Sequence, residues 1–244
     1  MKNTLGIIGG MGPLATVKLF NKIVLLTDAS SDQEHLDIVV YNKTTIPDRT
    51  QFIKGTGENP IQHLVYAANQ LELAGADYLI MPCNTAHFFY SEIIKHINIP
   101  FISMIEETVN YVVKEYPQLR QIGLLATEGT IMAKIYDKAF GDSGIEVIKP
   151  SFEDQQVVSG IIYDIKKGND NMDIKKYKDV INRMQSRGVQ MFVLGCTELS
   201  VAYEMFNMDI SCIDPSEIIA VSSIEQAGKE VKYDMLQTLR QKII

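Results

Sequence analysis

The feature that most constrains the fold is an internal repeat that spans most of the 244 residues. Three segments of the first half recur in the same order in the second half: LGIIGGMGPLAT (5–16) as IGLLATEGTIMA (122–133), ADYLIMPCNTAH (76–87) as VQMFVLGCTELS (189–200), and NIPFISMIEE (98–107) as DISCIDPSEI (209–218). Their offsets of 117, 113 and 111 residues drift slowly, and the middle pair aligns Cys83 with Cys196. This pattern indicates a duplicated structural unit.

Each half of the repeat is predicted to be an α/β unit. Short runs rich in Ile, Val and Leu, typical of buried parallel strands, alternate with longer segments of helical period. The predicted strands are 5–10, 36–42, 76–82 and 100–104 in the first half, and 121–127, 145–150 and 190–195 in the second. The predicted helices are 60–75, 105–116, 130–140, 173–188 and a final one over 216–243. The fold class is therefore α/β, with two similar α/β domains and mainly parallel sheets.

The two domains are expected to pack closely, because no Pro-, Gly- or Ser-rich linker separates the halves. The first domain is expected to comprise residues 1–104 plus 216–244, since the last helix can return to it. The second domain is expected to comprise residues 105–215. Ligands of open parallel sheets bind beyond the carboxyl ends of the strands, so the site should lie in the cleft between the domains.

Cys83 and Cys196 each follow a predicted strand, and two domains that face each other would bring both thiols to one cleft. Polar residues able to cap a helix come next, Asn-Thr at 84–85 and Thr-Glu at 197–198. The dipole and free N–H groups of a helix N-terminus stabilise a thiolate. Both cysteines are therefore predicted to be reactive, although a lone cysteine is more often a small buried hydrophobe.

A pair of opposed thiols suits one kind of chemistry. Inverting a carbon that carries an acidic hydrogen needs a base on one face and a proton donor on the other, and these roles exchange in the reverse reaction. The third cysteine, Cys212, aligns with Phe101 and is predicted to be a core residue. Because the cysteines lack C-x-x-C spacing, reduced thiols are expected rather than a disulfide framework.

A dinucleotide site is one alternative for the first glycine-rich loop, because GIIGGMGPLA (6–15) contains G-x-G-x-x-A after a strand. The next predicted strand ends in YNK (41–43), which offers no acidic residue to hold a ribose. The glycines are better explained by close approach of a small anionic ligand to the backbone, at residues that include Met11 and Gly12. The matching loop ATEGTI (126–131) is predicted to do the same.

A metal site is the second alternative, because His87 lies four residues after Cys83. Two ligands do not make a zinc site, and Cys196 has no histidine near it in the sequence. We therefore expect no metal and no cofactor.

Charge and hydropathy limit the partners. The net charge of −7 and the absence of a long basic cluster argue against a nucleic-acid or anionic-membrane surface. No apolar run approaches the ~18 residues that span a bilayer, and the glycines near the N-terminus do not suit a signal peptide. A cytoplasmic protein with a small-molecule substrate is expected.

Arg49 and two lysines are candidate substrate ligands. Arg49 is predicted to lie in a loop at the carboxyl side of a strand, where its guanidinium could bind a carboxylate through two hydrogen bonds. Lys166 and Lys167 end a predicted helix before Gly168, a position that lysines also favour without any function.

These motifs resemble those of the cofactor-independent aspartate/glutamate racemases, and most closely those of the aspartate racemases. The matching segments, in the order of the family, are GIIGGMGPLAT, IPDRT, MPCNTAHFF, ISMIEET, GLLATEGT and GCTEL. GGMGP and IPDRT are similar to the aspartate racemase branch, whereas the aspartate-serine-glycine start of glutamate racemases is absent. The resemblance implies two α/β domains related by pseudosymmetry, with the active site in the cleft between them and no pyridoxal phosphate.

The resemblance also implies roles for single residues. Cys83 and Cys196 match the catalytic pair of the family. Arg49 matches the arginine that binds the substrate side-chain carboxylate, and Lys166, rather than Lys167, matches a second basic position. The residues that match those holding the α-carboxylate and α-amino groups are Asn84, Thr85, Thr130 and Thr197. Family members are commonly homodimers, so a homodimer is expected.

We therefore expect a racemase that interconverts L- and D-aspartate by a two-base mechanism with Cys83 and Cys196. The alternatives are a racemase of broader range that also acts on glutamate, a non-catalytic binder of a dicarboxylic amino acid, and a redox sensor in which the two thiols form a disulfide. One methylene changes binding by only ~1 to 3 kcal/mol, so the residues leave aspartate and glutamate open. A binder needs neither acid nor base, and the paired thiols therefore argue against it.

Overall fold

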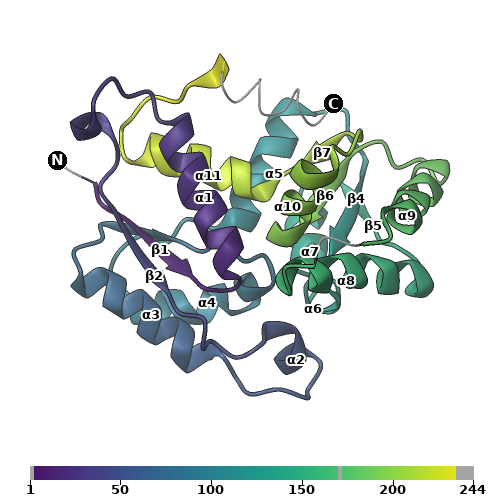
Figure 1. Ribbon diagram of the computed structural model, residues 1–244, viewed down its shortest axis with the longest axis horizontal. Coiled ribbons are helices and arrows are strands. Elements are labelled where there is room, and N and C mark those ends of the chain that lie inside the picture. Colours follow the sequence, from purple (N-terminus) through teal and green to yellow (C-terminus); the bar gives the residue numbers. More distant parts are fainter. Residues whose placement is uncertain (1–2, 170–171, 235–244) are drawn as a thin grey trace.

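The computed structural model describes residues 3–169 and 172–234, and these contain two sheets, one in each half of the chain (Figure 1). The first sheet has the strand order β2-β1-β3 and the second the order β5-β4-β6-β7. All strand pairs within these two sheets are parallel. The predicted α/β fold with two similar units and parallel sheets is confirmed.

Helices and strands alternate along both halves. The first half contains β1 (Leu5–Gly9), α1 (Pro13–Leu26), η1 (Asp32–Glu34), β2 (Ile38–Asn42), α2 (Arg49–Ile53), α3 (Ile61–Leu73), β3 (Tyr78–Ile80), η2 (Thr85–Phe89), α4 (Tyr90–Ile93) and η3 (Ile94–His96). The second half contains α5 (Met104–Glu115), β4 (Gln121–Ala126), α6 (Glu128–Met132), α7 (Ile135–Gly141), β5 (Glu146–Ile148), α8 (Phe152–Lys166), α9 (Ile174–Ser186), β6 (Phe192–Gly195), α10 (Thr197–Phe206), β7 (Cys212–Ile213) and α11 (Pro215–Gln226).

The sequence repeat is preserved in the register of the sheets. Gly6 of β1 pairs with Leu79 of β3, and the matching Gly123 of β4 pairs with Phe192 of β6. A Cβ atom added to Gly6 would come within 2.5 Å of Leu79, and one added to Gly123 within 2.6 Å of Phe192. Both glycines therefore leave room for a large apolar neighbour on the adjacent strand.

Helices cover both faces of each sheet, and the buried residues alternate between the faces. In β1, Ile7 packs with α1 and α11, whereas Ile8 packs with α3. In β4, Leu124 packs with α5 and α7, whereas Leu125 packs with α8, α9 and α10. The two halves thus share one layered architecture at matching residues.

The fourth predicted strand of the first half, residues 100–104, is wrong in its extent. Phe101 alone forms a parallel bridge, to Leu79, at the place where Cys212 of β7 pairs with Phe192. The strand is short because Ser103 caps the N-terminus of α5, its side chain accepting a hydrogen bond from Glu106 N.

The predicted helix over residues 130–140 is interrupted. It divides into α6 and α7 at Lys134, whose left-handed backbone (φ 52°) cannot continue a helix. The long final helix predicted over 216–243 ends at Gln226, close to Gly228 with its positive φ of 71°. Val231 then forms an antiparallel bridge with Thr27, and residues 235–244 lie outside the described residues.

Helix α11, coloured yellow in Figure 1, packs beside α1 of the first half and α5 at the start of the second. Lys22 of α1 reaches this junction, where its Nζ lies 2.7 Å from Oδ2 of Asp214, the N-cap residue of α11. Asp214 Oδ1 also accepts a hydrogen bond from Ser200 of α10. One buried carboxylate therefore links helices from both halves.

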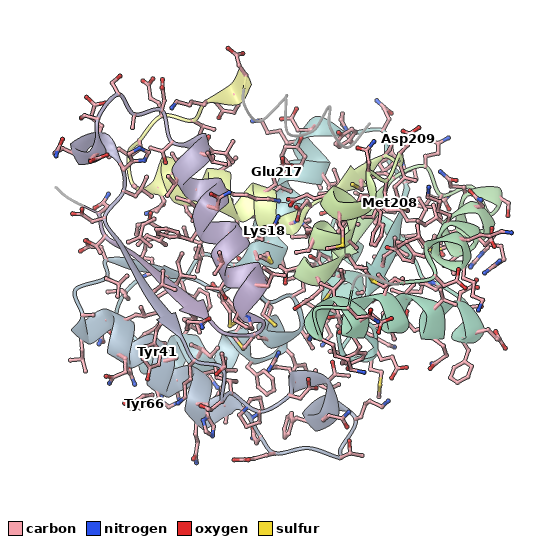
Figure 2. The ribbon with its side chains drawn as sticks, viewed as in Figure 1. Lys18, Tyr41, Tyr66, Met208, Asp209 and Glu217 are labelled. Atoms are coloured by element: carbon pink, nitrogen blue, oxygen red, sulfur yellow. The ribbon has the colours of Figure 1, made fainter. Side chains whose placement is uncertain are left out.

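The outer strand of the first sheet carries an aromatic contact. Tyr41 of β2 and Tyr66 of α3 lie side by side (Figure 2), with ring centroids 6.3 Å apart. Lys43 Nζ lies 5.4 Å from the centroid of the Tyr66 ring. Across residues 3–169 and 172–234, the helices are too short or too polar to cross a membrane.

Candidate active site

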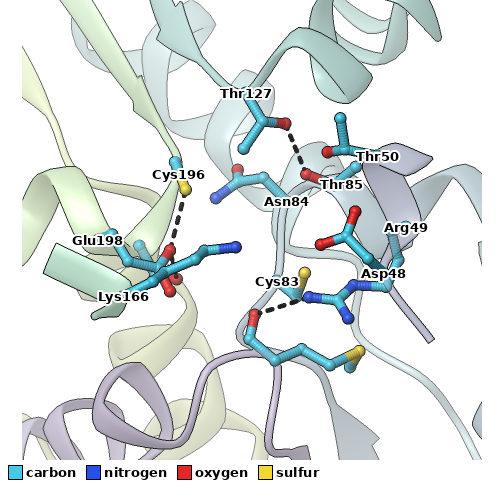
Figure 3. A pocket seen from close by; sticks show the side chains of 12 residues that line it. Asp48, Arg49, Thr50, Cys83, Asn84, Thr85, Thr127, Lys166, Cys196 and Glu198 are labelled. Carbon is cyan, nitrogen blue, oxygen red and sulfur yellow. Dashed lines mark hydrogen bonds between the residues drawn. The ribbon is translucent and has the colours of Figure 1, made fainter. Parts of the chain in front are cut away.

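A pocket lies where the two halves meet, beyond the carboxyl ends of the central strands (Figure 3). Most of the predicted site residues line it: Met11, Arg49, Cys83, Asn84, Thr85, Lys166, Cys196 and Thr197. The other two predicted site residues, Gly12 and Thr130, do not line the pocket but contact residues that do. A Cβ atom on Gly12 would come within 3.1 Å of Glu198 Oε1, and Thr130 Oγ1 lies 2.9 Å from Thr85 Oγ1.

Cys83 is buried and lies shortly beyond the end of β3. The helix that follows is only a short 3₁₀ segment, η2, and its boundary residue Asn84 makes no capping hydrogen bond. The prediction of a capped helix after Cys83 is therefore wrong. The reason is that Asn84 and Thr85 direct their side chains to residues of the second half instead, to Tyr136 and Thr127.

His87 fixes the backbone of Cys83. Its Nδ1 lies 2.9 Å from the carbonyl oxygen of Cys83, and its Nε2 accepts a hydrogen bond of 3.1 Å from Met104 N. Because Nε2 accepts, Nδ1 carries the proton and the ring is neutral. Burial lowers the pKa of His87 to about 4, which keeps it neutral near pH 7. The imidazole thus joins the Cys83 carbonyl to the start of α5.

Cys196 is the N-cap residue of α10 and is also buried. Its Sγ donates a hydrogen bond to Glu198 Oε2, 2.9 Å away. Burial first, and then the Glu198 carboxylate, raise the pKa of Cys196 well above its ordinary value, while Lys166 acts in the opposite direction. At the helix N-terminus that is predicted to make Cys196 reactive, the thiol is therefore also buried and beside a carboxylate, and both of these raise its pKa. Cys196 is a protonated thiol here.

Arg49 is the first residue of α2 rather than part of a loop, because Asp48 caps that helix by accepting from Gln51 N. Its guanidinium is buried against backbone carbonyls, with Nη1 3.1 Å from Pro47 O and Nη2 3.5 Å from Met11 O. The Nε of Arg49 is buried and has no hydrogen-bond partner among the described residues. The arginine is therefore held by the protein, with donor capacity to spare at the pocket.

Lys166, the last residue of α8, extends its ammonium into the pocket (Figure 3). Burial alone would lower the pKa of Lys166, but Glu198, Cys196 and Cys83 raise it above its ordinary value. Both lysines are exposed, but the neighbouring Lys167 is absent from the pocket lining. Of the two lysines left open by the sequence, Lys166 is the one that lies at the pocket.

Three threonine hydroxyls form a buried cluster across the two halves. Thr85 Oγ1 lies 2.9 Å from both Thr127 Oγ1 and Thr130 Oγ1, and the latter two lie 3.1 Å apart. Thr127 also caps α6, accepting a hydrogen bond from Thr130 N. A hydroxyl can donate or accept a hydrogen bond, so this cluster can offer a ligand either a donor or an acceptor.

The glycines of the first loop leave room for close contacts within the protein. Gly10 has a φ of 96°, and a Cβ atom there would come within 2.4 Å of the Lys43 carbonyl carbon. Gly12 lies against Glu198, as described above. Gly129 of the second loop similarly lies against Thr50, whose Oγ1 would be 2.7 Å from an added Cβ.

Thr127, from the loop 126–131 that was predicted to approach a ligand, lines the pocket, and so do three residues that were not predicted as site residues: Asp48, Thr50 and Glu198. Asp48 and Thr50 flank Arg49, and Glu198 follows Cys196 by two residues, so proximity in the sequence was a signal. Glu198 was interpreted as a helix-capping residue only. Its contact with the thiol depends on the turn of α10 and could not be read from residue type.

The described residues offer no obvious metal centre. Within the ranges 3–169 and 172–234, no three His, Cys, Asp or Glu side chains come together so as to hold a metal ion. His87, the one histidine considered from the sequence, uses both ring nitrogens within the protein.

Comparison with known proteins gives a consistent result. The profile of the Asp/Glu/hydantoin racemase family matches residues 8–222. The broad-specificity amino-acid racemase RacX of Bacillus subtilis is 29% identical over 231 residues, which are 90% of this chain and 96% of RacX. A glutamate racemase of Corynebacterium glutamicum is 25% identical over 171 residues, which are 70% of this chain and 60% of that protein.

A solved structure is also similar. The aspartate racemase of Picrophilus torridus superposes with a TM-score of 0.83 at 33% identity, and the match covers 99% of this chain and 100% of that chain.

Proposed function

The chain belongs to the Asp/Glu/hydantoin racemase family and is an amino-acid racemase, and we propose that it interconverts L- and D-aspartate with Cys83 and Cys196 as the two bases. The observation that carries the proposal is the pocket itself. It is lined by two thiols from matching positions of the repeat and by two cationic side chains, Arg49 and Lys166.

The proposed reaction moves one proton at each face of the substrate. For one enantiomer the Cys83 thiolate takes the hydrogen from Cα, and the C–H electron pair moves into the α-carboxylate. The Cys196 thiol then gives its proton to the opposite face of Cα and becomes a thiolate. For the other enantiomer the two cysteines exchange roles. The geometry supports this because Cys196 is a protonated thiol before substrate arrives.

The charged groups of the pocket favour a dicarboxylic substrate. The Arg49 guanidinium, with its unpaired Nε, suits the side-chain carboxylate of aspartate. The Lys166 ammonium stabilises negative charge that grows on the substrate in the transition state. Asn84 and the threonine cluster supply hydrogen bonds to the α-carboxylate and α-amino group.

A racemase that also accepts glutamate or other amino acids is the second candidate. The similarity to RacX, a broad-specificity amino-acid racemase, favours it. Both candidates use the same pair of thiols, so specificity measurements separate them.

The test is incubation of the purified protein with L-aspartate in D₂O, with reductant and without added pyridoxal phosphate or metal. Chiral separation and mass analysis should find D-aspartate that carries deuterium at Cα. A parallel incubation with L-glutamate and other amino acids measures the range of substrates. If L-aspartate neither inverts nor exchanges while other amino acids do, the aspartate proposal is wrong and the broader one stands. If no amino acid exchanges, the assigned chemistry is wrong.

A further inference from the structure

Only one of the two polar atoms of the Asn84 side-chain amide has a hydrogen-bond partner among the described residues. Asn84 follows Cys83 in the pocket lining and is only 2% exposed. Its Nδ2 is buried and has no hydrogen-bond partner among the described residues. Figure 3 shows this nitrogen pointing into the pocket. An unpaired buried donor is costly, which indicates that Nδ2 is placed for an acceptor that a ligand brings.

The other end of the same amide is held by a tyrosine from the second half. Tyr136 of α7 is fully buried, and its Oη donates a hydrogen bond of 2.5 Å to Asn84 Oδ1. Burial raises the pKa of Tyr136, so its hydroxyl stays protonated and remains a donor at neutral pH. With the Tyr136 hydroxyl donating to Oδ1, the NH₂ group of the amide faces the pocket.

We propose that Tyr136 is a positioning residue that fixes the Asn84 amide so that its NH₂ donates to the α-carboxylate of the substrate. The inference rests on the proposed function and adds to it a definite role for each end of the amide. An NH₂ group has no acceptor capacity, so it binds the carboxylate and not the α-ammonium group.

The stage at which negative charge develops on the substrate decides whether kcat or KM responds to a misdirected Asn84 amide. When Cα loses its proton, negative charge moves into the α-carboxylate, so a donor that is already aimed there binds the transition state more tightly than the substrate. A misdirected amide should therefore lower kcat more than it raises KM.

The contact also crosses between the halves. Asn84 belongs to the loop after β3, whereas Tyr136 belongs to α7, 52 residues further along the chain. The donor beside Cys83 is thus oriented by the second half, and it is correctly aimed only when the two halves are packed together.

The test is a double-mutant cycle of Tyr136→Phe and Asn84→Ala, measured as aspartate racemisation. Tyr136→Phe should lower kcat about tenfold with KM changed less than about twofold, a loss on the scale of one hydrogen bond. The double variant should be no slower than Asn84→Ala alone, because Tyr136 acts through Asn84. Tyr203→Phe is the matched control. Tyr203 is a buried tyrosine of the second half whose hydroxyl has no partner among the described residues, so its loss should leave kcat unchanged.

Asn84→Asp tests the orientation of the amide. This variant keeps an acceptor for Tyr136 but presents an oxygen to the pocket, so it should lose at least about 100-fold in kcat if the substrate group is a carboxylate. Activity retained by Asn84→Asp would overturn the inference. So would a Tyr136→Phe variant as active as Tyr203→Phe, or a double variant that loses the product of the two single effects.

A measurement without turnover separates this inference from the proposed function. In protein labelled with ¹⁵N-asparagine, the Nδ2 resonances of Asn84, assigned by their loss in Asn84→Ala, should shift when L-aspartate is added. In Tyr136→Phe the shift should be smaller. If this difference is seen in a protein that does not racemise aspartate, the proposed function fails and the inference stands. If L-aspartate shifts the resonances equally with and without Tyr136→Phe, or shifts neither, the inference fails whatever the activity.

Discussion

The thiol of Cys196 donates a hydrogen bond to Oε2 of Glu198 across 2.9 Å. In the repeat, the position that matches Glu198 is occupied by Thr85, whose hydroxyl contacts other threonines. The two thiols occupy matching positions but have chemically different neighbours.

Replacing this carboxylate should change the reactivity of Cys196. In Glu198→Gln the negative charge that raises the pKa of Cys196 is removed, while burial continues to raise it. Cys196 should then be alkylated by iodoacetamide faster at pH 8, as followed by mass spectrometry of the Cys196 peptide. Glu204→Gln, a partly exposed carboxylate on the same helix, is the control and should leave the rate unchanged. An unchanged rate in Glu198→Gln would show that the carboxylate does not govern this thiol.

Loss of either pocket thiol should nearly abolish racemisation. Cys83→Ala and Cys196→Ala each remove one proton-transfer group, and we expect the racemisation rate to fall by roughly 100- to 10,000-fold. Each variant should retain deuterium exchange, without inversion, for one enantiomer at most. Cys212→Ala is the control, because Cys212 belongs to β7 and lies outside the pocket lining. Near-normal turnover by Cys83→Ala would end the two-base account.

The adjacent lysines give a matched pair. Lys166→Met removes the ammonium group from the pocket and should lower kcat/KM for aspartate by roughly 100-fold, as does the loss of one group that stabilises transition-state charge. Lys167→Met removes an exposed charge one residue further on and should have little effect. Equal effects of the two substitutions would mean that the charge acts at long range and not in the pocket.

Acid should destabilise the fold through His87. The unfolded imidazole binds a proton near its ordinary pKa of 6.5, whereas the folded pKa is about 4. The unfolded state therefore binds more protons between these values, and the free energy of unfolding falls as pH drops from 6.5 to 4, by roughly 3 kcal/mol in total. Urea unfolding at pH 7.5 and 4.5 measures the fall. It should be smaller in His87→Gln, whereas the surface variant His63→Gln should match the wild type. If His87→Gln loses as much free energy of unfolding between pH 7.5 and 4.5 as the wild type does, other titrating groups cause the loss.

The ion pair of Lys22 and Asp214 should matter for stability far more than an exposed one. Lys22→Met leaves the Asp214 carboxylate buried without its cation, and we expect a loss of about 3 to 5 kcal/mol in the free energy of unfolding. Lys18→Met, which removes one of the two lysine partners of the partly exposed Glu204, should cost less than about 1 kcal/mol. Comparable losses in the two variants would show that Asp214 is compensated by its serine partners.

The sequence predicted the features that depend on local pattern and on the repeat. Gly6 and Gly123 align in the sequence and occupy the same register in the two sheets, and the two cysteines line one pocket where the halves meet. The break at Lys134 was missed, because a left-handed backbone at a lysine leaves no compositional signal.

Contacts that depend on how the halves pack could not be predicted. Thr85 looked like a capping residue, but packing against the second half gives its hydroxyl other partners. The bond between Tyr136 and Asn84 joins residues without any shared motif. Arg49 was expected in a loop, because the capping role of Asp48 was not recognised.

Thermodynamics limits the effect that the different neighbours of the two thiols can have on the reaction. The two enantiomers of an amino acid have the same free energy in water, so a racemase must produce equal amounts of both at equilibrium, whatever residues stand beside each thiol. The ratio kcat/KM is therefore the same for the two enantiomers. Glu198 on one side and Thr85 on the other can still make kcat and KM individually unequal, so that the protein can work faster on one enantiomer at high concentration while having no preferred direction at low concentration.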